Sequence, residues 1–371
     1  MMQVDVLIVG QGICGSFLSR ELERVGLSYI VFDEERPGTA SRAAAGLINP
    51  VTGRRFVKTW MIDELMPFVR EVYDGALLRP ARVVDFFPTP QMRLAFVKRC
   101  EEGGEFLRLP LREEEHNWDE LFHYELGYGV IGSCYLVDVQ GLLGRVRGEL
   151  RGRGVLREEC LMASELEIGE KAVRYRDVSA RWVIFCDGVS AAREGYFSRL
   201  PFAPNKGEAL IIEAAGLEKL RGRAGKELRG RVAGSEEVAD DGFVFKRGIS
   251  LAPWAAGLYW VGSSYEWSFD DAGPTAAFRE RTEAILKDWL RVPFRTVEHI
   301  ASVRPATLER RPFVGLHPVY PAVGIMNGMG TKGCSLAPWF ARQLAGLLKK
   351  GEAVMAEADV RRFRRVLGAI N

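Results

Sequence analysis

Three glycines near the N-terminus have the spacing of a dinucleotide-binding loop. Gly10, Gly12 and Gly15 form the pattern G-x-G-x-x-G in the sequence GQGICG. The first would permit a tight turn, the second would let the backbone approach a pyrophosphate, and the third would let a helix pack closely on a strand. Free N–H groups at the start of that helix, at Ile13 and Cys14, would lie beside the phosphates. The Cys14 side chain itself is interpreted as a small packing residue.

The elements around these glycines support the motif. Residues 4–9 are a short apolar run rich in β-branched residues, typical of a buried parallel strand. Apolar residues then recur at helical spacing until Gly26, and a second apolar run, 29–32, ends at Asp33. Asp33 is placed to accept hydrogen bonds from a ribose hydroxyl. This unit predicts dinucleotide binding, with a glycine-lined turn without a ligand as the alternative. The motif does not choose between FAD and NAD.

The composition limits the classes of protein that remain. A chain of 371 residues suits one large domain or two interleaved domains. The 51 Lys and Arg residues nearly balance 49 Asp and Glu residues, so no global field favours nucleic acid or an anionic membrane. Six scattered cysteines and four histidines argue against a metal site and for a reducing compartment. The N-terminal apolar run is too short for a signal peptide or a membrane span. We therefore expect a soluble cytoplasmic protein.

The remaining elements alternate between two kinds of pattern. Residues 155–158 and 182–186 are strand-like, whereas residues 207–267 contain several short strands divided by glycine-rich turns, consistent with an antiparallel sheet. Near the C-terminus a strand, 323–326, leads into a glycine-rich loop. A helix with one apolar face follows and ends before Gly351. We therefore expect an α/β protein with a second, α+β portion.

Several segments, in the right order, resemble the D-amino-acid oxidase superfamily of FAD enzymes, which includes glycine and sarcosine oxidases. The sequence SRAAAGLINP at 41–50 resembles the loop that passes beside the flavin in that superfamily. The other similar segments span most of the remaining chain: VIFCDG at 183–188, NKGE at 205–208, VRPAT at 303–307, RPFVG at 311–315, and NGMGTKG at 327–333 with Ala337-Pro338. The resemblance implies FAD rather than NAD as the cofactor.

The resemblance also implies a domain arrangement. A Rossmann-like FAD-binding domain formed by 1–60, 141–200 and 300–371 would be interleaved with an antiparallel-sheet substrate domain formed by 61–140 and 201–299. The FAD is expected to be non-covalent, because no cysteine lies between Arg304 and Gly330, the segment that carries the covalent link in some sarcosine oxidases. The implied FAD-binding residues are Gly10, Gly12, Ile13, Cys14, Gly15, Asp33, Glu34, Ser41, Arg42, Ala45, Gly46, Leu47, Gly188, Arg304, Gly328, Gly330, Thr331, Lys332 and Gly333.

Four residues are the candidates for the substrate side. Arg304 matches the superfamily position of an arginine that holds a substrate carboxylate, for which a guanidinium fork is well suited; a structural ion pair is its alternative. Lys332 matches a carboxylate-binding lysine, with an exposed loop lysine as its alternative. Arg55 is preferred slightly over Arg54 as a residue that faces substrate or cofactor. Tyr265 would offer a hydrogen bond, or it would only pack on the sheet.

The implied reaction oxidises the C–N bond of a small amine or amino acid. Hydride would pass from the α-carbon to flavin N5, and the resulting imine would hydrolyse. Oxygen or another acceptor would reoxidise the flavin. Three alternatives stay open: an NAD-dependent dehydrogenase, a catalytically silent FAD-binding protein, and a flavoenzyme acting on a carboxymethylaminomethyl group of a tRNA wobble uridine. The basic segment 221–231 would contact RNA in the last case and otherwise would be a solvated turn.

Overall fold

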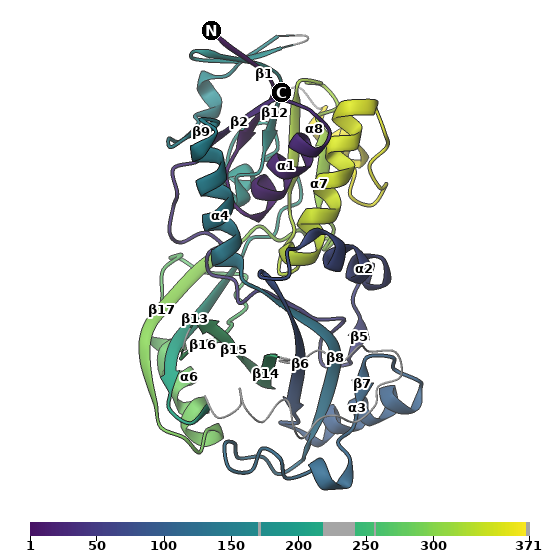
Figure 1. Ribbon diagram of the computed structural model, residues 1–371, viewed down its shortest axis with the longest axis vertical. Helices are drawn as coiled ribbons and strands as arrows, with labels where there is room; N and C mark the ends of the chain where they lie inside the picture. Colours follow the sequence, from purple (N-terminus) through teal and green to yellow (C-terminus); the bar gives the residue numbers. More distant parts are fainter. Residues whose placement is uncertain (170–171, 218–241, 256, 369–371) are drawn as a thin grey trace.

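The chain forms two parts that lie one above the other in Figure 1. This computed structural model describes residues 1–169, 172–217, 242–255 and 257–368. The upper part contains a sheet flanked by helices, and the lower part contains a strongly curved sheet (Figure 1). The chain passes between them several times, which agrees with the predicted interleaved α/β and α+β architecture. No described helix combines the length and the apolar character that crossing a bilayer requires.

The upper sheet is built around the predicted N-terminal strand, β1 (Met2–Val9). It pairs in parallel with β2 (Tyr29–Phe32) on one side and with β12 (Val178–Phe185) on the other. The strand β19 (Val323–Asn327) continues the parallel arrangement beyond β12. The shorter strands at the edges are β9 (Leu156–Arg157), β10 (Glu167–Ile168), β11 (Val173–Tyr175) and β18 (Phe313–Leu316). Because β1, β12 and β19 are parallel neighbours, their carboxyl ends meet at one edge of the sheet.

Three helices bury one face of this sheet. They are α1 (Ile13–Arg24), α4 (Val139–Gly152) and α7 (Gly333–Lys350), and their apolar residues share one core cluster with β1. The predicted C-terminal ends of α1 and α7 are confirmed. Gly26 and Gly351 follow these helices with φ of +70° and +73°, a conformation that favours glycine. The short helix α8 (Arg364–Leu367) contributes Leu367 to the core on the opposite face.

The lower sheet has the strand order β17-β13-β16-β15-β14-β6-β8-β3, with β7 also paired to β8. All its pairs are antiparallel except β14 with β6, which are parallel. The sequence pattern did not indicate that exception, because β6 and β14 lie far apart in the chain. The strands are β3 (Leu47–Ile48), β6 (Leu78–Phe86), β7 (Leu107–Arg108), β8 (Tyr128–Val137), β13 (Asn205–Ala214), β14 (Gly242–Arg247), β15 (Ile249–Ala255), β16 (Leu258–Gly262) and β17 (Phe294–Arg304).

The two faces of the lower sheet have different partners. On one face, Leu210 and Ile212 share a core with α6 (Ala276–Trp289). On the other face, Ile211 and Trp260 pack with Ala45 of the loop that resembles the flavin loop. The indole Nε1 of Trp260 donates a hydrogen bond to the carbonyl of Ala43 at 3.1 Å. This second face therefore looks toward the upper part of the molecule.

The sheets divide the chain at slightly different places from the predicted domain boundaries. The strand β17 extends the lower sheet to residue 304, whereas the FAD-binding domain was predicted to resume at residue 300. The strand β3 belongs to the lower sheet although it lies within 1–60. The helix α2 (Ile62–Val72) packs with the core of the upper part. The remaining elements are β4 (Val51–Thr52), β5 (Val57–Lys58) and α3 (Pro90–Glu101). The division into functional domains remains a prediction.

Candidate cofactor and active site

The turn from β1 to α1 has the geometry that its glycines predict. Gly10 has φ of +95°, and a Cβ there would lie 2.8 Å from the carbonyl oxygen of Cys186. A Cβ on Gly15 would lie 1.9 Å from the carbonyl oxygen of Gly10, so only glycine lets α1 approach the turn. The N–H of Ile13 donates to the Ser41 hydroxyl at 3.0 Å. Cys14 is buried in the core, and burial raises the pKa of its thiol to about 12, which supports a packing role.

Asp33 ends β2 as predicted, and the structure adds a partner that the sequence did not reveal. The Asp33 carboxylate accepts hydrogen bonds from the backbone N–H groups of Gln11 and Glu35, both at 2.9 Å, and from Arg147 of α4 at 2.8 Å. The side chain of Arg147 is only 5% exposed and also pairs with Glu158 at 2.9 Å. A carboxylate has about four acceptor positions. One position therefore stays free for a ribose hydroxyl, and Asp33 is held rigidly.

The loop at 41–47 connects the two parts of the molecule. A Cβ on Gly46, which has φ of +78°, would lie 2.0 Å from the carbonyl oxygen of Val137 in β8. Leu47 then pairs with Leu136, so the loop becomes an edge strand of the lower sheet. Arg42 pairs with Glu35 at 3.3 Å rather than standing free. Glu34 is exposed and pairs with Arg36. The loop backbone, more than its charged side chains, thus remains available to a cofactor.

The C-terminal glycine loop reaches the same region. Gly328 and Gly330 have φ of +78° and +56°, which lets the backbone turn sharply between β19 and α7. A Cβ on Gly333 would lie 3.2 Å from Cγ2 of Ile13, so the N-termini of α7 and α1 lie side by side. Gly188 lies at the end of β12, and its carbonyl accepts from the Asn327 amide at 2.8 Å. Four segments that are far apart in the sequence thereby converge. Thr331 is exposed beside them.

Lys332 occupies the N-cap position of α7, in positively charged surroundings. It is partly buried, and burial together with the nearby Arg311 and Arg310 lowers the pKa of its ammonium group. Across the part of the chain that the structure describes, no carboxylate pairs with Lys332. The helix N-terminus adds partial positive charge at the same place. An anionic group, such as a reduced flavin ring or a carboxylate, would be stabilised here.

Arg304 is a partly buried cation whose contacts among the described residues are all neutral. Its Nη1 donates to the Asn205 side chain and its Nη2 to the Ser263 hydroxyl, each at 2.7 Å. The guanidinium lies 5.5 Å from the ring centroid of Tyr265, and burial lowers its pKa. Within the described ranges, no Asp or Glu pairs with it, so the structural ion pair weighed from the sequence is not seen. Both Nη atoms also donate to the carbonyl of Ser264 at 3.4 Å, so among the described hydrogen bonds only the Nε–H of the fork is left without a partner. A bound carboxylate would pair with the fork by replacing these long contacts.

Gly207 of β13 provides the space in which Arg304 lies. A Cβ on Gly207 would be 1.9 Å from Nη2 of Arg304. The Gly207→Ala variant is therefore expected to fold and bind FAD normally but to displace the guanidinium. We predict a KM for a carboxylate-bearing substrate roughly 10- to 100-fold higher, because an ångström of misplacement has effects of that size. Steady-state kinetics and flavin absorbance together check this result, and an unchanged KM would contradict it.

Two predicted substrate-side residues, Tyr265 and Arg55, lie in more exposed positions than Arg304. Tyr265 contacts Arg304 but is 51% exposed, and its ring also packs on Trp267. Arg55 lies in the exposed turn between β4 and β5, where its carbonyl accepts from Arg99 at 3.2 Å. The structure shows no contact between Arg55 and Arg304. The role of Arg55 therefore stays a prediction, without support from its position.

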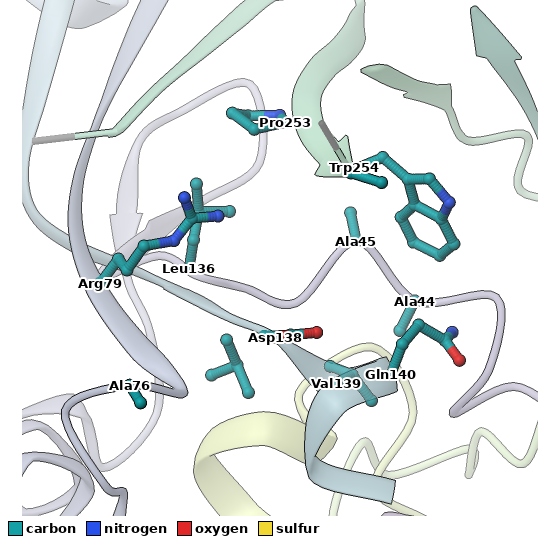
Figure 2. Close-up of a pocket in the computed structure, with 12 residues that line it drawn as sticks. Ala44, Ala45, Ala76, Arg79, Leu136, Asp138, Val139, Gln140, Pro253 and Trp254 are labelled. Carbon is teal, nitrogen blue, oxygen red and sulfur yellow. The ribbon is translucent and has the colours of Figure 1, made fainter. Parts of the chain in front are cut away.

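A pocket of about 350 Å³ lies beside the loop that carries Ala45. Figure 2 shows Arg79 and Trp254 on two sides of it, with Ala45 and Ala44 on the side of Trp254 and Asp138 below. It thus opens between the lower sheet, the start of α4 and the predicted flavin loop. None of the four candidate substrate-side residues lines it. In residues 1–169, 172–217, 242–255 and 257–368, no group of His, Cys, Asp or Glu could hold a metal ion.

Together these features define a class of protein. A parallel sheet with a glycine-rich turn at its edge, two converging helix N-termini and an acidic residue after β2 is a dinucleotide-binding site. The comparison with family models then identifies the family. The model of the DAO family, described as FAD dependent oxidoreductase, matches residues 5–347. The chain belongs to this family of FAD-dependent oxidoreductases. FAD, rather than NAD, is its cofactor, and the glycine contacts described above fit it.

Solved structures share the whole fold. Glycine oxidase from Bacillus cereus ATCC 14579 is similar with a TM-score of 0.73 at 15% identity, covering 95% of this chain and 99% of that chain. Iminodiacetate oxidase from Chelativorans sp. BNC1 gives 0.68 at 20% identity, covering 95% and 96%. L-α-glycerophosphate oxidase from Mycoplasma pneumoniae, with FAD bound, gives 0.64 at 14% identity, covering 94% and 95%. These identities establish a shared fold and leave the substrate to be argued from the site.

Proposed function

We propose that this flavoenzyme oxidises the C–N bond of a small amine that carries a carboxylate, such as an amino acid. One observation carries the proposal: Arg304 is a partly buried guanidinium whose partners among the described residues are all uncharged. It lies over Gly207, on the face of the lower sheet whose Trp260 contacts the predicted flavin loop. A buried cation without a counter-ion is costly, and a bound carboxylate would remove that cost.

The chain's residues would bind and orient the substrate, while FAD, when bound, supplies the chemistry by accepting hydride at N5. Arg304 would hold the carboxylate through a charge-assisted pair. Lys332 and the N-terminus of α7 would stabilise negative charge on the cofactor. Trp260 and the apolar residues around it would exclude water. Oxygen or another electron acceptor would complete the cycle, and the imine would hydrolyse in solvent.

The choice of an amine depends on the site, because the similar structures do not agree on a substrate. Glycine oxidase and iminodiacetate oxidase are named for amines, whereas glycerophosphate oxidase is named for a phosphate ester of an alcohol. Arg304 suits the carboxylate of an amino acid. The tRNA alternative gains no support, because the basic segment 221–231 lies outside the described residues.

Product analysis tests the proposal. The holoenzyme is incubated in air with glycine, sarcosine, proline and D-amino acids, and with the 2-hydroxy acid analogue of each. For at least one amine we expect equal amounts of a trapped carbonyl compound and of ammonia or primary amine; for a cyclic substrate such as proline, the two groups appear in one ring-opened product. The hydroxy acids should not react. Turnover of a hydroxy acid but of none of the amines would contradict the proposal.

A further inference from the structure

A carboxyl group that the proposed reaction does not use lies at the cofactor edge of the upper sheet. Asp187 follows β12 by two residues, where this strand ends between β1 and β19. An ideal Cβ on Gly10, the first glycine of the dinucleotide loop, would lie 3.2 Å from Cα of Asp187. In open α/β sheets, ligands bind outside the carboxyl ends of the strands, at a place like this one. Asp187 therefore adjoins the path of the FAD diphosphate and ribityl chain.

The one polar side chain that the structure shows bonded to Asp187 is uncharged. The Asn327 amide, at the end of β19, donates to Oδ1 of Asp187 at 3.4 Å and to the carbonyl of Gly188 at 2.8 Å. The Asn327 side-chain oxygen accepts from the N–H of Gly328 at 2.8 Å, so the amide orientation is set. Among the described residues, Asp187 has no Lys, Arg or His partner. A charged carboxylate here would lack any counter-ion.

The surrounding titratable groups also favour the neutral acid. Glu194, after the turn that follows Asp187, adds negative potential. The neighbouring thiols are Cys186, the residue after β12, which also interacts with Cys14 of α1, and Cys160 beyond β9. Burial is the largest cause and raises the pKa of Asp187 to about 7; a hydrogen bond from the backbone N–H of Asp187 opposes it, and Glu194 adds a smaller increase. The diphosphate of FAD would add negative charge at the same edge and would favour the protonated form further.

We propose that Asp187 binds FAD as a neutral carboxylic acid and donates its proton in a hydrogen bond to an oxygen of the diphosphate–ribityl segment. Because Asn327 donates to Oδ1, that oxygen is the carbonyl of the acid and the proton resides on Oδ2. Among the described hydrogen bonds, Oδ2 has no protein acceptor for this proton. The proposal depends on FAD as the cofactor and is independent of which substrate the enzyme oxidises.

Protonation of Asp187 makes the affinity for FAD depend on pH. Below pH 7 the acid is already neutral, so FAD binds without proton uptake. Above pH 7 the free protein carries the carboxylate, and binding must take up a proton. The affinity for FAD therefore falls as pH rises through the pKa of the free protein, by up to tenfold per pH unit.

Release of FAD from the holoenzyme, followed by flavin fluorescence between pH 6.5 and 8.5, tests the proposal. For wild type we expect the Kd of FAD to rise roughly 25-fold over this range, as a pKa near 7 requires. Asp187→Asn keeps a neutral donor, so its Kd should stay near the low-pH wild-type value throughout. Glu194→Gln is the matched control: it removes a nearby exposed carboxylate and should retain most of the slope.

Calorimetry of FAD binding to wild type in two buffers of different ionisation enthalpy gives a second readout that needs no variant. We expect uptake of about one proton at pH 8.5 and almost none at pH 6. A wild-type Kd that is constant with pH, no proton uptake at pH 8.5, or an Asp187→Asn protein with the wild-type slope would each overturn the proposal. Loss of amine oxidation with this pH dependence intact would count only against the proposed substrate.

Discussion

Replacing Arg304 with alanine is expected to lower kcat/KM for a carboxylate-bearing amine by roughly 30- to 5,000-fold, or about 2–5 kcal/mol. Truncation leaves the substrate carboxylate without a partner in a site where its counter-ion was already desolvated. FAD content should stay at the wild-type level, because the side chain contacts Asn205, Ser263 and Tyr265 rather than the glycine loops. Steady-state kinetics and the flavin-to-protein absorbance ratio measure both halves of this prediction.

A matched control is available on the same strand. Arg295 of β17 is exposed and pairs with Glu213 at 2.8 Å, so Arg295→Met removes an arginine without touching the proposed site. Its kinetics should equal those of wild type. An Arg304→Lys variant should recover only part of the activity, since an ammonium group cannot reproduce the planar fork. Unchanged kinetics in Arg304→Ala would remove this residue from the active site.

The second large effect is expected from Gly12→Val, which should weaken FAD binding roughly 100-fold or more, about 3 kcal/mol. Gly12 has φ of −74°, a backbone conformation that valine tolerates, so the fold should survive. A Cβ there would already lie 3.1 Å from the Ser41 hydroxyl. The larger side chain would occupy the space in which the backbone must approach the pyrophosphate.

The control for this variant is Gly148→Val. Gly148 lies in α4, and apart from its own helix backbone no atom lies within 4 Å of an added Cβ, so a valine side chain has room there. We expect full flavin content and no loss of helix stability, because valine has a higher helix propensity than glycine. Flavin absorbance after gel filtration and titration with FAD measure both proteins. Stoichiometric flavin in the Gly12→Val protein would show that the β1–α1 turn does not bind the diphosphate of FAD.

The sequence predicted the cofactor side of the fold because its signals are local. The strand β1, the turn at Gly10 and Gly12, the helix α1 and Asp33 all lie within the first 33 residues. Each depends on spacing and glycine conformation that can be read along the chain. The resemblance placed the more distant loops, and the structure brings Gly333 against Ile13. The resemblance and the structure therefore place the cofactor at the same edge of the upper sheet.

The contacts that complete the site were less predictable, because they join distant residues. Nothing in the spacing around Arg147 indicates that it holds Asp33, which lies 114 residues away. Likewise, Gly207 makes room for Arg304 only because β13 and β17 are neighbours in the sheet. The sequence placed Asp187 only within the segment VIFCDG, and its pairing with Asn327 depends on the register of β12 and β19. The packing of α4 against the upper sheet decides the first contact, and strand order decides the other two; the sequence pattern supplied neither.

Anaerobic bleaching of the bound flavin measures directly whether a carboxylate-bearing amine reduces the cofactor. The holoenzyme, free of oxygen, is mixed with glycine, sarcosine, proline and D-amino acids, and with amines that match them but lack the carboxylate. We expect loss of flavin absorbance with at least one carboxylate-bearing amine, and reduction at least roughly 30-fold slower with its decarboxylated partner. Equal bleaching by both members of a pair, or bleaching by none of the amines in a protein that dithionite reduces normally, would contradict it.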